Sequence, residues 1–115
     1  MKYLVTGSAG FIGYHLVKTL LRNNKNFVFA IDKRRLNLKH KNLKVITKNI
    51  NNLKKFPKVD MVFHLAAFNG TKYFYTKPFN VIDQNILSTL KLVKYYKDKK
   101  LIKFITAGSS EAYAG

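Results

Sequence analysis

The sequence predicts an α/β protein built on one parallel sheet. Short apolar runs alternate with helical patterns along the 115 residues, the runs are apolar on both faces, and a glycine-rich turn joins the first run to the first helix. Strands that are buried on both faces suit a parallel sheet covered by helices. The length allows one small domain, residues 1–115.

The first half of the chain alternates strands with one helix. Residues Lys2–Thr6 indicate a buried strand, and Phe11–Asn23 a helix with one broad apolar face. Phe27–Asp32 is the second predicted strand, and Leu43–Thr47, apolar at 43, 45 and 46, is the third. The connection between them, residues 33–42, is rich in Lys and Asn and short for a helix.

The second half continues the same alternation. Val59–Leu65 is the fourth predicted strand, Phe79–Tyr96 is a helix with apolar residues at spacings of three and four, and Ile102–Ala107 is the fifth strand. Right-handed crossovers between these elements give a doubly wound sheet with the strand order 3-2-1-4-5.

Positive charge dominates the composition. The chain has 22 Lys+Arg against 5 Asp+Glu, a formal charge of +17. The lysines are spread from Lys2 to Lys103, and they far outnumber the arginines on which base readout relies. We therefore predict no specific nucleic-acid partner, although loose, salt-sensitive binding to polyanions follows from the charge alone.

Several classes of site are excluded by composition. With no Cys, the chain has no disulfide, thiolate metal site or Cys nucleophile. Its three His are scattered, so we predict no metal site, and we interpret His64, between apolar strand residues, as a core histidine. The start has no signal-peptide apolar region and no run is long enough for a membrane span, which predicts a cytoplasmic protein without a membrane partner.

A glycine-rich turn follows the first strand, with glycines at 7, 10 and 13. Gly7 permits a turn that a Cβ would block, Gly10 lets a pyrophosphate approach the backbone, and Gly13 lets the helix press against the strand. The start of the helix directs free N–H groups at the phosphates. The motif therefore predicts a dinucleotide site.

Asp32 supports this prediction. It closes the second strand 19 residues after Gly13, where an acid accepts hydrogen bonds from the adenosine ribose hydroxyls. A carboxylate there repels a 2′-phosphate and favours NAD over NADP. Lys33, Arg34 and Arg35 follow at once and could neutralise this repulsion and hold the phosphate of NADP.

The motifs together resemble one family. The Thr-Gly-x-x-Gly-x-x-Gly form of the turn is similar to that of the extended short-chain dehydrogenases/reductases, the NAD-dependent epimerase/dehydratase family acting on nucleotide sugars. Three further motifs match in order: His64-Leu65-Ala66-Ala67, Asn85-Ile86-Leu87-Ser88-Thr89-Leu90 and Ser109-Ser110-Glu111-Ala112-Tyr113. The resemblance implies a Rossmann-type NAD(P)-binding domain, a nucleotide-sugar substrate, and transient hydride transfer from the sugar to NAD.

The resemblance also assigns roles. Asn49-Ile50 stands where the family usually has Asp-Ile beside the adenine, which is a departure from its pattern. The cofactor-binding candidates are Gly7, Gly10, Phe11, Ile12, Gly13, Asp32, Lys33, Asn49, Ile50, Leu65, Ala66, Ala67 and Asn85.

The catalytic candidates follow the fifth strand. Ser109, with Ser110 as second choice, matches the Ser/Thr that hydrogen-bonds the reacting hydroxyl, and Glu111 matches an acid near the reacting carbon. The family's Tyr-x-x-x-Lys is expected past Gly115. The four pairs with that spacing all precede the fifth strand, and none is assigned: Tyr14/Lys18, Tyr73/Lys77, Tyr95/Lys99 and Tyr96/Lys100.

Two interpretations of function remain open at this point. The first is the NAD-binding part of a nucleotide-sugar epimerase, dehydratase or decarboxylase. The second is a non-catalytic nucleotide-binding remnant, or a partner-binding module with a polyanion-attracting surface. Because the family continues with further strands and a substrate region, the sheet is predicted to be truncated on its C-terminal side. A homodimer or a C-terminal partner chain would cover the exposed edge.

Overall fold

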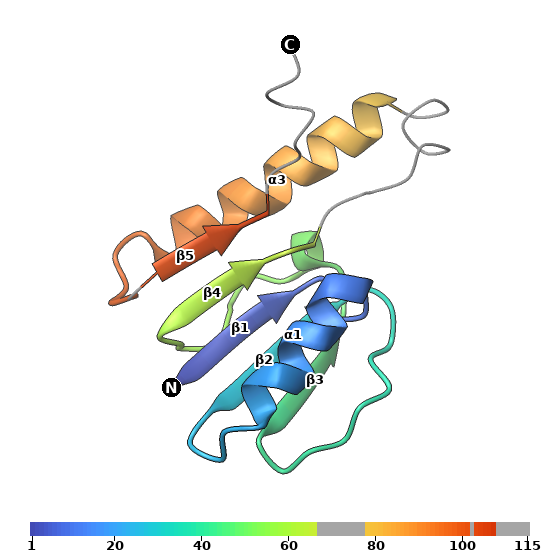
Figure 1. Ribbon diagram of the computed structural model, residues 1–115. Coiled ribbons are helices and arrows are strands. Elements are labelled where there is room, and N and C mark those ends of the chain that lie inside the picture. Colours follow the sequence, from blue (N-terminus) through green and yellow to red (C-terminus); the bar gives the residue numbers. More distant parts are fainter. Residues whose placement is uncertain (67–77, 102, 108–115) are drawn as a thin grey trace.

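The structure is a computed structural model that describes residues 1–66, 78–101 and 103–107. Five parallel strands form one sheet in the order β3-β2-β1-β4-β5 (Figure 1). The strands are β1 Lys2–Thr6, β2 Phe27–Asp32, β3 Leu43–Thr47, β4 Met61–His64 and β5 Lys103–Thr106. The helices are α1 Phe11–Leu21, the 3-10 turn η1 Ile50–Asn52, and α3 Pro78–Tyr96. The predicted fold class and strand order are confirmed.

The predicted boundaries differ from the structure in the helices and the later strands. Helix α1 ends at Leu21 rather than Asn23, because the Asn23 side chain accepts a hydrogen bond from the Lys25 N–H (3.0 Å) and turns the chain. Strand β4 begins at Met61 rather than Val59, although Val59 is buried in the core. The short η1 was not predicted, because three residues carry no helical periodicity.

Helix α1 covers one face of the sheet (Figure 1). Its buried residues Val17 and Leu21 pack against Val5 of β1 and against Val28 and Ala30 of β2. Successive strand residues point to opposite faces, so Leu4 and Ile31 lie on the other side. This alternation explains why residues 3–5 of β1 and 27–31 of β2 are apolar on both faces of the sheet.

Helix α3 and η1 cover the opposite face. Leu92 and Tyr96 of α3 belong to one cluster with Leu4, Ile31 and Val62 of the strands. Three side chains of α3 also hydrogen-bond the backbone of residues 51–57: Lys91 Nζ to Asn51 O (2.8 Å), Tyr95 Oη to Phe56 O (2.8 Å) and Tyr96 Oη to Pro57 O (2.6 Å). The helix is thereby fixed along its second half.

The strand order reverses at one point of the sheet, which marks its carboxyl edge as the expected place for a ligand. The chain moves from β1 to β2 on one side, whereas β4 and β5 extend the sheet on the other. In such doubly wound sheets, ligands bind where the strand order reverses, beyond the carboxyl ends of the strands. Here that point lies between β1 and β4, where the glycine-rich loop begins.

Candidate functional site

The glycine-rich loop after β1 is closely packed. Gly7 has φ +71°, a conformation that L side chains rarely adopt, and a Cβ there would lie 2.7 Å from Ala66 N and from Leu65 C. A Cβ on Gly13 would collide with Gly7 O and lie 2.9 Å from the Ser8 Cα. Gly10 is more open, since its Cβ would stand 3.3 Å from Gly7 O. The predicted roles of Gly7 in the turn and Gly13 in close packing therefore match the geometry.

The loop places the start of helix α1 at the carboxyl edge of the sheet. Gly7 N–H donates to Ile31 O of β2 (2.9 Å), and Gly10 N–H donates back to Gly7 O (3.1 Å). Gly10 is the N-cap and supplies no side-chain acceptor, and the first turn holds no acidic residue. The N–H groups of the first turn thus lack a capping side chain and carry the positive end of the helix dipole. Phe11 and Ile12, which begin the helix, are exposed.

Asp32 lies directly beside this loop. Its side chain is 8% exposed, and Oδ2 accepts a hydrogen bond from the Ala9 N–H (2.9 Å). Oδ1 accepts from the Arg34 N–H (2.8 Å). The carboxylate therefore fixes the glycine-rich loop to the end of β2, a role that the sequence did not reveal.

The basic residues after β2 occupy different positions. The Arg34 side chain is 65% exposed, with Nε 3.7 Å from Asp32 Oδ1 and Nη2 3.7 Å from the Cβ position of Gly10. Arg34 therefore reaches over the loop and partly offsets the Asp32 charge. Lys33 is exposed to solvent.

The other predicted cofactor residues make structural contacts of their own. Asn49 caps η1 by accepting from the Asn51 N–H (2.9 Å), and the Ile50 side chain is buried in the core. Leu65 and Ala66 follow β4 and lie against Gly7, and Asn85 is half-buried in α3. Ala67, Ser109, Ser110 and Glu111 lie outside the described residues.

A buried polar network joins Thr6, His64 and Thr89 next to the glycine-rich loop. Thr6 and His64, at the ends of β1 and β4, are almost fully buried, and Thr6 Oγ1 lies 2.7 Å from His64 Nδ1. His64 Nε2 lies 3.1 Å from Thr89 Oγ1 of α3. Burial lowers the pKa of His64 to about 4, so the ring is neutral at physiological pH. The interpretation of His64 as a satisfied core histidine is confirmed.

Two of the Tyr/Lys pairs make contacts within the pair. Lys18 Nζ stacks over the Tyr14 ring and Lys99 Nζ over the Tyr95 ring, at 5.4 and 4.8 Å from the ring centres. Burial and the neighbouring Tyr95 raise the pKa of Tyr96, the opposite of what a catalytic base requires. The cation–π contacts give Tyr14/Lys18 and Tyr95/Lys99 a packing role.

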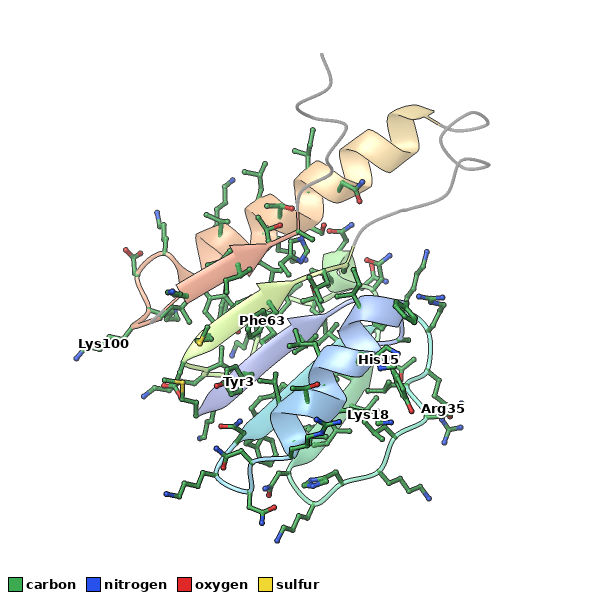
Figure 2. All side chains as sticks on the ribbon, in the orientation of Figure 1. Tyr3, His15, Lys18, Arg35, Phe63 and Lys100 are labelled. Atoms are coloured by element: carbon green, nitrogen blue, oxygen red, sulfur yellow. The ribbon has the colours of Figure 1, made fainter. Side chains whose placement is uncertain are left out.

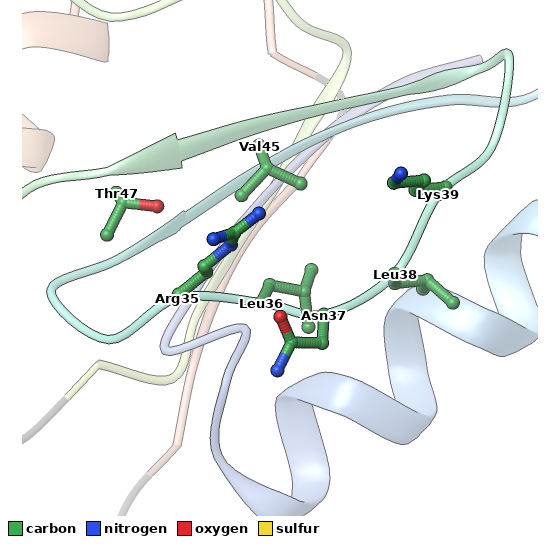
Figure 3. Close-up of a pocket in the computed structure, with 7 residues that line it drawn as sticks. All are labelled: Arg35, Leu36, Asn37, Leu38, Lys39, Val45 and Thr47. Atoms are coloured by element: carbon green, nitrogen blue, oxygen red, sulfur yellow. The ribbon is translucent and has the colours of Figure 1, made fainter.

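A separate cavity of about 520 Å³ lies between the 33–42 loop and β3 (Figure 3). Arg35 extends from the loop toward β3, and no predicted cofactor residue contributes to the lining. Leu36, also in the lining, is buried and anchors the loop to the α1 side of the sheet. The cavity marks the space beside a crossover that contains no helix among its residues.

The positive charge is distributed around the molecule. Arg35, in the loop after β2, and Lys100, in the segment before β5, lie at opposite sides of the molecule in Figure 2. Within residues 1–66, 78–101 and 103–107, no cluster of three or more His, Asp or Glu could hold a metal ion. In the same part of the chain, no helix has the length and hydropathy of a membrane span.

The residues present fit a dinucleotide. The cradle at Gly10 has room that a side chain would fill, and the helix start offers uncapped N–H groups. Ser8, fully buried in the loop, has a hydroxyl with no hydrogen-bond partner among the described residues. A polar ligand or bridging water at the loop would supply that missing partner.

Comparisons with known proteins agree with this geometry. Residues 3–115 match the model of the NAD dependent epimerase/dehydratase family. The chain is 32% identical to a dTDP-D-glucose 4,6-dehydratase of Dictyostelium discoideum, over 97% of this chain and 30% of that protein. It is also 32% identical to UDP-glucuronic acid decarboxylase 6 of Arabidopsis thaliana, over 98% of this chain and 35% of the relative.

Solved structures show the same likeness. The UDP-glucuronic acid 4-epimerase of Bacillus cereus, in complex with NAD, superimposes with a TM-score of 0.85 at 33% identity. The match covers 100% of this chain and 42% of the epimerase. The chain thus spans less than half the length of the proteins that it matches.

Proposed function

The chain belongs to the NAD dependent epimerase/dehydratase family, and from this premise we propose that it binds NAD at the glycine-rich loop and forms the cofactor-binding part of an enzyme that acts on a nucleotide sugar. The observation that carries the proposal is the juxtaposition of Asp32 and the uncapped start of α1 across the loop. An anion-binding helix terminus and a ribose-binding carboxylate are the two contacts by which such a fold holds a dinucleotide.

The chain's own groups would divide the cofactor between them. The backbone N–H groups at Phe11, Ile12 and Gly13 would hold the pyrophosphate, and Asp32 would accept from the adenosine ribose hydroxyls through its remaining lone pairs. When bound, NAD supplies a reversible hydride acceptor. The Asp32 charge disfavours a 2′-phosphate, so NAD is the cofactor that we propose.

The catalytic candidates remain a proposal based on family resemblance. Strand β5 pairs with β4 in parallel and ends at Thr106, opposite His64, so the chain leaves β5 at the same edge as the glycine-rich loop. We propose that Ser109 or Ser110 hydrogen-bonds the reacting hydroxyl of the sugar and that Glu111 acts near the reacting carbon. Similarity to an epimerase, a dehydratase and a decarboxylase supports the nucleotide-sugar class, not one reaction within it.

Replacing Asp32 by alanine tests the cofactor site. A charged hydrogen bond contributes about 1.5–3 kcal/mol, so we expect Asp32→Ala to raise the Kd for NAD about tenfold or more. Isothermal titration calorimetry with NAD measures the constant, and urea unfolding of the same sample shows whether the variant is folded. Asp98→Ala is the matched control, because Asp98 is an exposed acid beyond α3. An unchanged Kd in folded Asp32→Ala would overturn the assignment.

A further inference from the structure

His64 is a buried, doubly hydrogen-bonded group that the proposed function does not use. It is 3% exposed, and its two ring nitrogens contact different elements: Nδ1 faces Thr6 of β1 and Nε2 faces Thr89 of α3. The Phe104 ring of β5 lies 6.3 Å from the imidazole, centre to centre. None of these contacting side chains is titratable, so the roles of the two nitrogens follow from hydrogen-bond counting.

The Thr6 hydroxyl fixes the direction of the first bond. Thr6 Oγ1 accepts from the Leu65 N–H (3.0 Å) and from the Ala66 N–H (3.1 Å). A hydroxyl has two lone pairs and one hydrogen, so the Thr6 O–H must donate to His64 Nδ1. Nδ1 is therefore unprotonated, and the neutral ring carries its hydrogen on Nε2 and donates it to Thr89 Oγ1.

The Leu65–Ala66 backbone, which Thr6 holds by hydrogen bonds, packs directly against the glycine-rich loop. The Leu65–Ala66 backbone lies so close to Gly7 that a Cβ there would stand 2.7 Å from Ala66 N. The Leu65 N–H also bonds to Thr6 O (3.2 Å), and Gly7 O in turn accepts from the Gly10 N–H. Contacts thus run without a break from Thr89 through His64 and Thr6 to the loop that faces the cofactor.

We propose that His64 is a positioning residue for cofactor binding: its Nε2-protonated imidazole holds the Thr6 hydroxyl as a double acceptor and so fixes the glycine-rich loop. The inference rests on the proposed NAD site. If Nδ1 carried a proton, Thr6 Oγ1 would be left with three donors for two lone pairs, and one of the Leu65 and Ala66 bonds would be lost.

Two amide substitutions separate the ring nitrogens. Asparagine can place its carbonyl oxygen near the Nδ1 position and accept from Thr6, whereas glutamine places its amide near Nε2 and leaves Thr6 without an acceptor. One lost hydrogen bond corresponds to about a tenfold change, so we expect His64→Gln to raise the Kd for NAD about tenfold and His64→Asn to stay within about threefold. Thr6→Val should match His64→Gln, and the double variant should add little.

The readouts distinguish positioning from a structural role. Nitrogen NMR of the wild-type protein should show His64 protonated at Nε2 only, and calorimetry with NAD should rank the two amide variants as above. Protonation at Nδ1, or equal loss of NAD affinity in folded His64→Asn and His64→Gln, would overturn the proposal. If the wild type bound no NAD, the proposed function would fail. Hydrogen exchange at the Leu65 and Ala66 amides would still test whether His64 positions Thr6. If it does, exchange should be faster in His64→Gln than in His64→Asn, and equal rates would contradict the proposal.

Discussion

Replacing Gly13 with alanine is expected to destabilise the protein by about 3 kcal/mol or more, because the new Cβ would collide with backbone rather than with a flexible side chain. It would meet Gly7 O and lie 2.9 Å from the Gly7 carbonyl carbon and the Ser8 Cα. Helix α1 could make room only by moving away from β1, which would open the contacts of Val17 and Leu21 with the sheet. Urea unfolding followed by circular dichroism measures the loss.

Gly10→Ala is the matched control for this prediction. Its backbone has φ −78°, which alanine adopts without strain, and its Cβ would meet Gly7 O at 3.3 Å and Arg34 Nη2 at 3.7 Å. We expect this variant to stay folded while its methyl group occupies the cradle proposed for the pyrophosphate, so that NAD affinity falls. Equal stability of the two variants would contradict the assignment of Gly13 to helix–strand packing.

The fold could be predicted because its determinants are local. The residues of β1, β2 and β3 were predicted without error, since each strand is a short apolar run bounded by polar or glycine residues. The crossover rules then set the strand order. The ends of α1 and β4 were missed because they depend on single side-chain bonds, such as Asn23 Oδ1 to the Lys25 N–H and Asp60 Oδ2 to the Lys2 N–H.

The candidate site was predicted only in part. Its glycines and Asp32 could be singled out because a mechanism links their spacing to a dinucleotide, and their role in binding one stays a prediction. The contact of Asp32 with the Ala9 N–H, 23 residues away, has no sequence pattern. The Thr6–His64–Thr89 network was also missed, because it joins residues 58 and 25 positions apart whose types are individually unremarkable in a core. Such contacts appear only once the strand order brings β1, β4 and α3 together.

The stability of the protein is expected to fall as the pH drops from about 6.5 towards 4. Burial holds the pKa of His64 at about 4 in the folded protein, whereas an unfolded histidine has its ordinary value of 6.5. Between these values the unfolded chain binds the proton and the folded one does not, so acid favours unfolding. The contribution of the neutral His64 to the free energy of unfolding is present in full only well above pH 6.5. Between pH 7 and pH 5 the free energy of unfolding falls by about 2 kcal/mol for this reason.

Urea unfolding at a series of pH values between 7 and 5 measures this slope. His64→Gln removes the titrating group while keeping a polar side chain, so it should be less stable than the wild type at pH 7 but show a flatter dependence on pH. The carboxylates are common to both proteins, and their titration cancels in the difference between the two curves. Parallel curves would mean that His64 titrates with the same pKa in the folded protein as in the unfolded chain, so that neither burial nor the hydrogen bond from Thr6 to Nδ1 disfavours the protonated ring. The pH series therefore tests the protonation state of the imidazole independently of any bound cofactor.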